Sequence, residues 1–180
     1  MIAQPSDVLS FWRAAGPAKW FTKEPAFDAD IQARFLETYE AAASGKLAAW
    51  QRTPDEALAL VIVLDQFPRN MFRGDAKSYS ADGLARVVAG RAIARGYDRQ
   101  VPPDNRQFLY LPFEHSENLA DQDRCCALFR FIGDAEHLKW ADLHADIIRR
   151  FGRFPHRNDV LGRATTLQER AFLDGDGFKG

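Results

Sequence analysis

Eight consecutive apolar residues, Ala57–Leu64, follow a strong helix-start signal in this chain of 180 residues. Thr53 can act as the N-cap, Pro54 suits the first helical position, and Glu56 can complete a capping box with Thr53. A helix that is apolar on every side must be surrounded by other elements, and eight residues are too few to cross a bilayer. The sequence therefore predicts a buried helix in the middle of the fold.

Helical spacing recurs along the rest of the chain, and no stretch alternates apolar and polar residues as a half-buried strand would. We expect Pro68 to end or kink the apolar helix, with Phe67 in extended geometry. Lys19–Phe21 and Val101–Asp104 are expected in connectors, and a short helical piece around Leu47 and Trp50. Glycines and prolines mark the ends of further helices at about 6–15, 28–43, 80–95, 105–111, 121–132, 135–151 and 166–173. Eight or nine helices with short connections predict an all-α fold of antiparallel helix pairs.

The length fits one domain, so residues 1–180 are expected to form a single all-α domain with a frayed tail at 174–180. The composition is 46% hydrophobic and 27% charged, which allows a core without disulfides and argues against disorder. The net charge of -1 does not favour a nucleic-acid partner or attraction to a membrane.

The first residues lack the basic and apolar regions of a signal peptide. Cys125 and Cys126 are adjacent in a helical pattern, so their side chains diverge, and neither a disulfide framework nor a cysteine zinc site is expected. Reduced, buried thiols indicate a cytoplasmic protein. Arginine outnumbers lysine by 18 to 6, which fits either anion recognition or a GC-rich genome.

The first polar segment is Leu64–Arg73, which begins with the last residue of the apolar run. A carboxylate at Asp65 is expected to be desolvated, and it then needs a cationic partner, for which Arg69 and Arg73 are nearest. With Gln66, these residues form either a structural ion pair at a kinked helix end or part of a ligand site.

The second polar segment is Leu111–Glu117, in which Pro112 interrupts a helix. His115 and Glu117 could form an acid–base pair or supply two metal ligands, or they could be capping and surface residues. No HExxH motif is present, so we expect no bound metal, and nothing in the sequence indicates a cofactor.

The third polar segment runs from Arg149 to Asn158, across the end of a helix at Gly152. Arginines there can simply complement the negative end of the helix dipole. Alternatively, Arg153, His156 and Arg157 converge on an anion from a constrained turn, while the preceding arginines are solvated.

The three segments contain long motifs in a fixed order: LDQFPRN with FRG, LPFEHSE with LADQ, and RFGRFPHRN with LGR. From about Val8 to Leu173 the chain resembles a bacterial family catalogued as domain of unknown function nine-two-four. The resemblance implies a TPR-like, right-handed array of paired helices, and it brings no established activity. The family's motif positions correspond here to Trp20, Phe21, Asp65, Gln66, Arg69, Asn70, Arg73, His115, Glu117, Arg153, His156, Arg157 and Asn158.

Three functional hypotheses follow. The chain could be a binding module whose groove takes an anionic small molecule or peptide. It could be an enzyme with His115 or His156 as general acid or base, or its polar residues could be a purely structural ion network. Because alternate helix ends meet at one end of a helical array, we expect one concave site, in which a titrating histidine strengthens anion binding at lower pH. Its members would be Asp65, Arg69, His115, Glu117, Arg153, His156 and Arg157.

Overall fold

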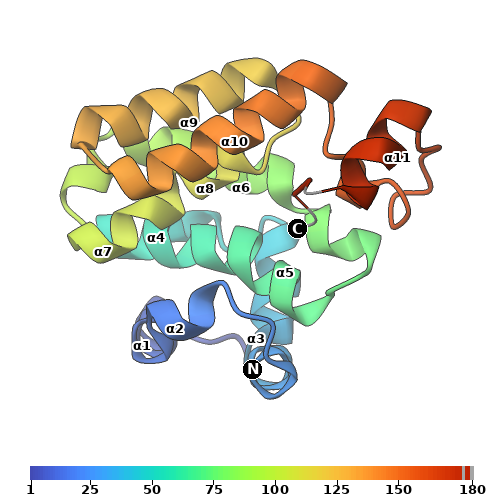
Figure 1. Cartoon of the computed structure of the whole chain (residues 1–180). Coiled ribbons are helices and arrows are strands. Elements are labelled where there is room, and N and C mark those ends of the chain that lie inside the picture. The colour runs from blue at the N-terminus through green and yellow to red at the C-terminus, as the bar shows by residue number, and fades with distance from the viewer. Residues whose placement is uncertain (176, 179–180) are drawn as a thin grey trace. The chain divides into compact units, whose positions relative to one another are not determined.

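The computed structural model describes residues 1–175 and 177–178 of the chain, and in these residues the regular secondary structure is helical throughout (Figure 1). When residues 54–71 and 103–114 are each taken as one helix, the described part contains nine helices. The predicted all-α class and helix number are therefore confirmed, whereas the TPR-like arrangement stays a prediction. None of the described helices combines the length and apolar character needed to cross a membrane.

The chain divides into two compact units, which are described separately below. Unit 1 comprises Met1–Arg73 and Lys77–Pro112, and unit 2 comprises Gly74–Ala76 and Phe113–Gly180. That all 180 residues form one domain stays a prediction.

The helical segments follow one another with short connections. From the N-terminus these are α1 (Pro5–Ala15), α2 (Pro17–Trp20), α3 (Pro25–Ala43), η1 (Ala48–Gln51), α4 (Pro54–Val61), η2 (Ile62–Gln66), α5 (Phe67–Met71), η3 (Ala76–Tyr79), α6 (Asp82–Ala94), η4 (Tyr97–Arg99), α7 (Pro103–Arg106), η5 (Gln107–Leu109) and α8 (Leu111–Glu114). They continue with α9 (Leu119–Ile132), α10 (Ala135–Phe151), η6 (Pro155–Arg157) and α11 (Leu167–Asp174).

The central helix of unit 1 begins as the sequence predicts. The Thr53 hydroxyl accepts a hydrogen bond from the Glu56 N–H, and the Glu56 carboxylate accepts one from the Thr53 N–H. All eight residues of the apolar run are buried. Aromatic side chains of α1, α2, α3, α5 and η5 pack against one another in the same unit, and they include Trp12, Trp20, Phe27, Phe35, Phe67 and Phe108.

The expectation for Pro68 is wrong, because the helix passes through this residue. Phe67 has helical dihedral angles of −57° and −42° rather than extended ones. The reason is the π-helical turn η2, in which the Phe67 N–H donates to the carbonyl of Ile62, five residues earlier. One additional residue in the turn moves the carbonyls that a proline ring would otherwise strike, so the chain stays helical. Asp65 and Gln66 consequently lie inside a helix and not at its end.

Two other local expectations need correction. Lys19 and Trp20 lie in the short helix α2 rather than in a connector, and α7 begins at Pro103 inside the expected linker. Pro112 occupies the second position of α8, where its missing N–H costs no helical hydrogen bond. Both short helices begin with proline at the first position, which is the place where proline favours a helix.

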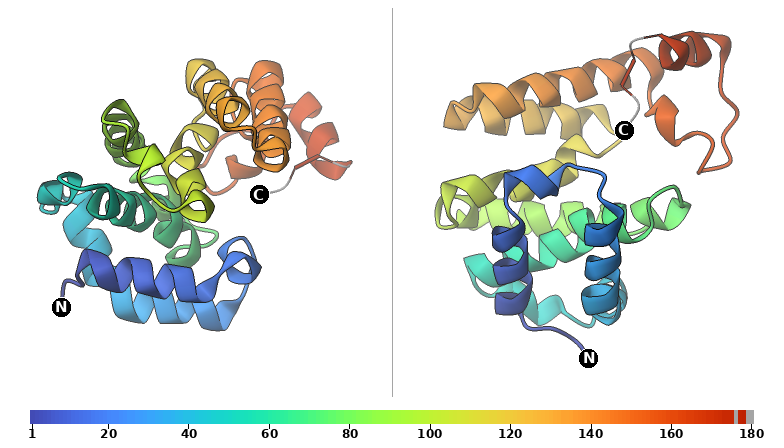
Figure 2. Two further views of the ribbon diagram at one scale, coloured as in Figure 1. Left: turned by 90° about the vertical axis from the view of Figure 1, so that its left-hand side faces the viewer. Right: turned by 60° about the horizontal axis from the view of Figure 1, so that its bottom comes forward.

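Unit 2 is built on the antiparallel pair α9 and α10, which lie side by side along their lengths (Figure 2). Gly133 ends α9 in the left-handed conformation, and the Asp134 carboxylate caps the start of α10. Gly152 ends α10 in the same conformation, with a φ of 69°. A turn then leads to α11, whose Thr166–Glu169 capping box the sequence predicted.

The described part of the tail makes contacts within unit 2, and its expected fraying stays a prediction. Asp174 is the last residue of α11, and the Gly177 N–H donates to the carbonyl of Phe172. Phe178 packs against the apolar cluster of Ile147, Ile148 and Phe154. Residues 176, 179 and 180 of the expected tail lie outside the described part of the chain.

Replacing Gly152 and Gly83 by alanine should change stability in opposite directions. Gly152 adopts a left-handed conformation that disfavours a Cβ atom, so Gly152→Ala should lower the unfolding free energy by about 1 kcal/mol. Gly83 is exposed in α6, has ordinary helical geometry and has open space around it. Gly83→Ala should therefore raise the unfolding free energy by about 0.5 kcal/mol. Urea denaturation of both variants checks this, and an equal effect at the two positions would contradict the assigned helix end.

Candidate functional site

The polar motif residues lie in two clusters, one in each unit, whereas Trp20 and Phe21 belong to neither. The unit 1 polar cluster consists of Asp28, Asp65, Gln66, Arg69, Asn70, Arg73 and Asp82. The unit 2 polar cluster consists of Glu114, His115, Glu117, His144, Arg153, His156, Arg157, Asn158, Arg163 and Glu169. The shared concave site combines members of both clusters, and it stays a prediction.

In unit 1, Asp65 is fully buried and pairs with Arg69, as expected for a carboxylate after an apolar run. The Arg69 Nη1 lies 3.3 Å from the Asp65 Oδ1, and the Gln66 amide donates to Oδ2. Arg69 also forms a bidentate pair with Asp82, at 3.0 and 3.1 Å. Burial alone would lower the Arg69 pKa, but the charges of Asp65 and Asp82 outweigh it and raise that pKa. The guanidinium is therefore permanently charged and shared between two carboxylates.

Arg73, the other candidate partner, pairs with Asp28 of α3. Its Nε and Nη2 donate to the two Asp28 oxygens at 2.9 and 3.0 Å, and the Asn70 amide donates to Oδ1 at 2.7 Å. The cluster thus has three carboxylates against two arginines, so it offers no excess positive charge to an anion. In unit 1 the polar motif residues tie α3 and α6 to the π-helical turn, which fits the structural hypothesis.

Breaking the Asp65 pair should be costly. Asp65→Ala leaves the Arg69 charge without one of its two carboxylates next to the core, and we expect a loss of about 3 kcal/mol in unfolding free energy. The matched control is Asp55→Ala, because Asp55 pairs with Arg13 at 3.4 Å while its side chain is 61% exposed. That change should cost less than about 1 kcal/mol. A loss below about 0.5 kcal/mol for Asp65→Ala would show that the carboxylate is not buried in solution.

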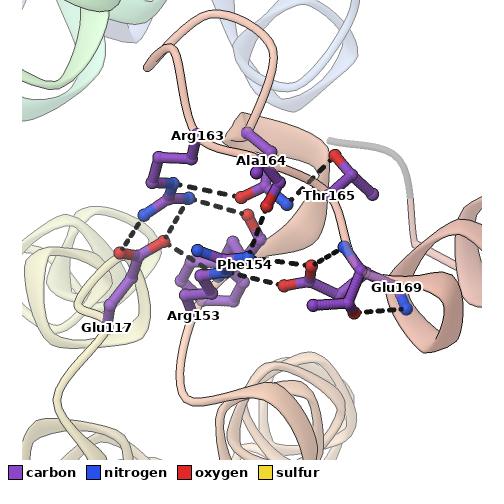
Figure 3. A network of polar contacts seen from close by, with 9 residues as sticks. Glu117, Arg153, Phe154, Arg163, Ala164, Thr165 and Glu169 are labelled. Carbon is purple, nitrogen blue, oxygen red and sulfur yellow. Dashed lines mark hydrogen bonds and ion pairs between the residues drawn. The ribbon is translucent and has the colours of Figure 1, made fainter.

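In unit 2, Glu117 joins two distant segments of the chain. Its carboxylate accepts from Arg163 Nη1 at 2.7 Å and Nη2 at 3.0 Å, and from the Phe154 N–H at 2.8 Å (Figure 3). Burial would raise the Glu117 pKa, but these hydrogen bonds and the Arg163 charge lower it. Glu117 is therefore ionised and already accepts three hydrogen bonds. A general acid must instead carry a proton that it can donate. The described residues contain no group of three or more His, Cys, Asp or Glu side chains placed to hold a metal ion.

Arg153 pairs with Glu169 of α11, on the other side of the same turn. Its Nε and Nη2 donate to the carboxylate at 2.6 and 2.9 Å, and Nη2 also donates to the Ala164 carbonyl at 2.8 Å. The hydrogen bonds from Arg153, together with those from Thr166, lower the Glu169 pKa to about 2. Figure 3 shows that the Arg153–Glu169 and Glu117–Arg163 pairs flank the Phe154 backbone. The turn between α10 and α11 is thus fixed by two bidentate pairs.

The fixed turn positions Arg157, His156 and Asn158. Arg157 is buried, with its guanidinium 4.5 Å from the Phe154 ring centroid and its Nη1 donating to the His115 carbonyl at 3.0 Å. Asn158 is buried as well and accepts from the Arg163 Nε at 3.0 Å. Arg157 is therefore held by the Phe154 ring of its own turn and by the His115 carbonyl of a distant segment.

His156 is the member of this turn whose surroundings are least explained by the fold. Its Nδ1 is buried and makes no hydrogen bond within the described residues. Burial, followed by the charge of Arg157, lowers the His156 pKa to about 3, so the imidazole is neutral at physiological pH. His156 therefore does not titrate near neutral pH in the chain without a ligand, and stronger anion binding at lower pH stays a prediction. A buried polar atom without a partner calls for a ligand, a water or a functional reason.

His144 of α10 is a second histidine of the unit 2 polar cluster, and it was not among the residues selected from the sequence. Its Nδ1 donates to the Trp140 carbonyl at 2.8 Å, and the Glu114 carboxylate lies 3.5 Å from the same atom. Burial dominates and lowers the His144 pKa to about 4, although the hydrogen bond to the Trp140 carbonyl would raise it. The signal available in the sequence was its place on the buried face of α10, with Ala141, Ala145 and Ile148.

Several partners of the motif residues were likewise missed. Arg163 belongs to the LGR motif but was not selected, and Glu169 was recognised only as a capping residue. Asp28 and Asp82 carry no local signal beyond their position in the first turn of a helix. Cys125 and Cys126 are buried as expected, and burial raises both thiol pKa values, that of Cys126 to about 11.

The two neutral histidines should make the protein less stable in mild acid. Their pKa values of about 4 and 3 lie below the ordinary 6.5, so the unfolded chain binds more protons and stability falls as the pH drops below about 6.5. Each histidine contributes a slope of up to about 1.4 kcal/mol per pH unit. Urea denaturation between pH 6.5 and 5 measures how the unfolding free energy changes with pH. Carboxylates with lowered pKa values affect this energy only at a lower pH.

His156→Phe retains an aromatic ring and should remove roughly half of that slope. A stability that stays constant between pH 6.5 and 5 would contradict the burial of both neutral rings.

The chain is similar to a known protein family and to a solved structure. A family model described as "Bacterial protein of unknown function (DUF924)" matches residues 8–177. Among solved structures, a protein of unknown function from Agrobacterium tumefaciens is similar, with 48% sequence identity and a TM-score of 0.92. That similarity covers 94% of this chain and 96% of the other. No curated protein matches the chain. The resemblance drawn from the three sequence motifs is thereby confirmed.

Proposed function

The chain belongs to a bacterial protein family of unknown function, and we propose that it acts as a binding module for an anionic small molecule or an acidic peptide. The observation that carries this proposal is His156, whose buried Nδ1 has no hydrogen-bond partner in the described residues while Arg157 lies beside it. An imidazole N–H and a guanidinium together suit a carboxylate or phosphate oxygen. The turn between α10 and α11 is the proposed binding site.

Preorganisation supports binding at this turn. Both of its flanks are fixed by bidentate arginine–carboxylate pairs, so a ligand would not have to order the turn before binding. Arg157 is buried against Phe154, and a cation with a fixed position loses little side-chain entropy when an anion arrives.

The enzyme hypothesis has less support from the same residues. A general acid or base works best when its pKa lies near the operating pH, and burial holds that of His156 near 3. Glu117 is ionised and already accepts three hydrogen bonds. The arrangement favours recognition of a charge rather than transfer of a proton.

Isothermal titration calorimetry with inorganic phosphate, citrate and a poly-glutamate peptide tests the proposal. We expect at least one probe to bind, and the variants Arg157→Ala and His156→Phe to weaken its affinity by about tenfold or more, since a hydrogen bond to a charged group contributes roughly 1.5–3 kcal/mol. His156→Phe serves where Arg157→Ala disturbs folding, because it keeps an aromatic ring on Phe154.

The matched control is Arg150→Ala. Arg150 lies in the same unit, half exposed and 3.4 Å from Asp146, so its removal should leave the affinity unchanged. Binding of none of the three probes, or equal losses in all variants, would favour the structural ion network over the binding module.

A further inference from the structure

The ring of Phe178 covers the two neutral histidines of unit 2. Its centroid lies 4.6 Å from that of His144 and 5.3 Å from that of His156, edge to face in both cases. Phe154 is 5.5 Å from His144 and 5.6 Å from His156, so the two histidines and Phe154 form one aromatic site that receives Phe178. Edge-to-face contacts of this kind stabilise an aromatic ring beyond the burial of its surface.

The backbone before Phe178 is also adapted to this position. The Gly177 N–H donates to the Phe172 carbonyl at 3.2 Å, at the end of α11. A Cβ atom at Gly177 would collide with that carbonyl, whereas one at Gly175 would make ordinary contacts with α11. The close approach therefore requires glycine at position 177 and directs the following side chain onto the histidines.

The sequence of the tail has the chemistry that the neighbouring turn would bind. Residues 174–180 read Asp-Gly-Asp-Gly-Phe-Lys-Gly, with two acidic residues before the phenylalanine. His156 is shared by the aromatic site and the proposed anion site, because its ring contacts Phe178 while Arg157 is the next residue. An acidic peptide with an aromatic side chain would therefore suit both the aromatic site and the proposed anion site.

We propose that His144, Phe154 and His156 form a recognition site for an aromatic side chain carried on an acidic peptide, which Phe178 occupies within the same chain and a partner's peptide occupies when the tail leaves. This inference rests on the proposed function and assigns its ligand class. The tail is then an internal competitor that restrains binding by partners.

The covalent link makes this competition effective. A segment attached close to its site has an effective concentration of about a millimolar, so a free peptide of the same sequence binds measurably only when the internal copy is weakened. The apparent affinity for a partner is reduced by the fraction of molecules whose site is occupied by Phe178.

The test uses a synthetic peptide with the sequence of residues 174–180 as the probe, and the full-length chain as the receptor. Histidine ring signals are followed by NMR while the peptide is titrated into the wild type, into Phe178→Ala and into Gly177→Ala. We expect the peptide to shift the His144 and His156 signals in both variants, with an affinity at least tenfold higher than for the wild type.

Two controls isolate the aromatic site from general effects. Gly175→Ala has room for its Cβ atom and should behave as the wild type. A peptide in which the phenylalanine is replaced by alanine should bind both variants at least tenfold more weakly than the unchanged peptide. Circular dichroism of each variant verifies that the helices remain, and Gly177→Ala keeps the phenylalanine in case Phe178→Ala disturbs the apolar cluster.

Each outcome separates the inference from the proposed function. Failure of the peptide to bind Phe178→Ala and Gly177→Ala, or equal binding to the wild type, overturns the tail site whatever phosphate and citrate do. If the peptide still binds after Arg157→Ala, and phosphate, citrate and poly-glutamate do not bind at all, the aromatic site is supported. The same result overturns the anion-binding function.

Discussion

Bidentate pairing between arginine and carboxylate side chains holds both polar clusters in place. Arg69 with Asp82, Arg73 with Asp28, Arg153 with Glu169 and Arg163 with Glu117 each join two segments that are separate in the sequence. Charges near an apolar core are costly unless each finds a partner with good geometry, and the planar guanidinium provides such a partner at two oxygens at once. The helices supply the core, while these pairs fix the turns between them.

The two clusters serve different purposes in this account. In unit 1 the carboxylates outnumber the arginines, and the residues tie α3, α5 and α6 to the π-helical turn. In unit 2 the pairs fix a turn on which Arg157 and a neutral His156 stand next to an aromatic site. Neutral histidines packed on aromatic rings are suited to recognition, because they offer a hydrogen bond without the cost of burying a charge. In the proposed function, ligand binding and competition by the tail both involve the His156 imidazole ring.

Much of the fold followed from local signals in the sequence. The capping boxes at Thr53 and Thr166 and the glycine ends at Gly133 and Gly152 act within one helical turn, and the pairing of Asp65 with Arg69 spans only four residues. Pro68 was misjudged because its effect depends on a π-helical turn that begins six residues earlier. The pairs of Arg73 and Glu117 join residues 45 and 46 positions apart, and no local pattern identifies such partners. The low histidine pKa values arise from burial, which only the folded chain creates.

The central claim is that a charge pair fixes the turn that carries His156 and Arg157. The most direct measurement is the coupling free energy between Glu117 and Arg163, obtained from a double-mutant cycle of Glu117→Gln and Arg163→Gln in urea denaturation. We expect a coupling above about 1 kcal/mol, since both side chains are mostly buried and the contact is bidentate. A coupling below about 0.3 kcal/mol, typical of weak surface pairs, would contradict it and leave the turn without its proposed anchor.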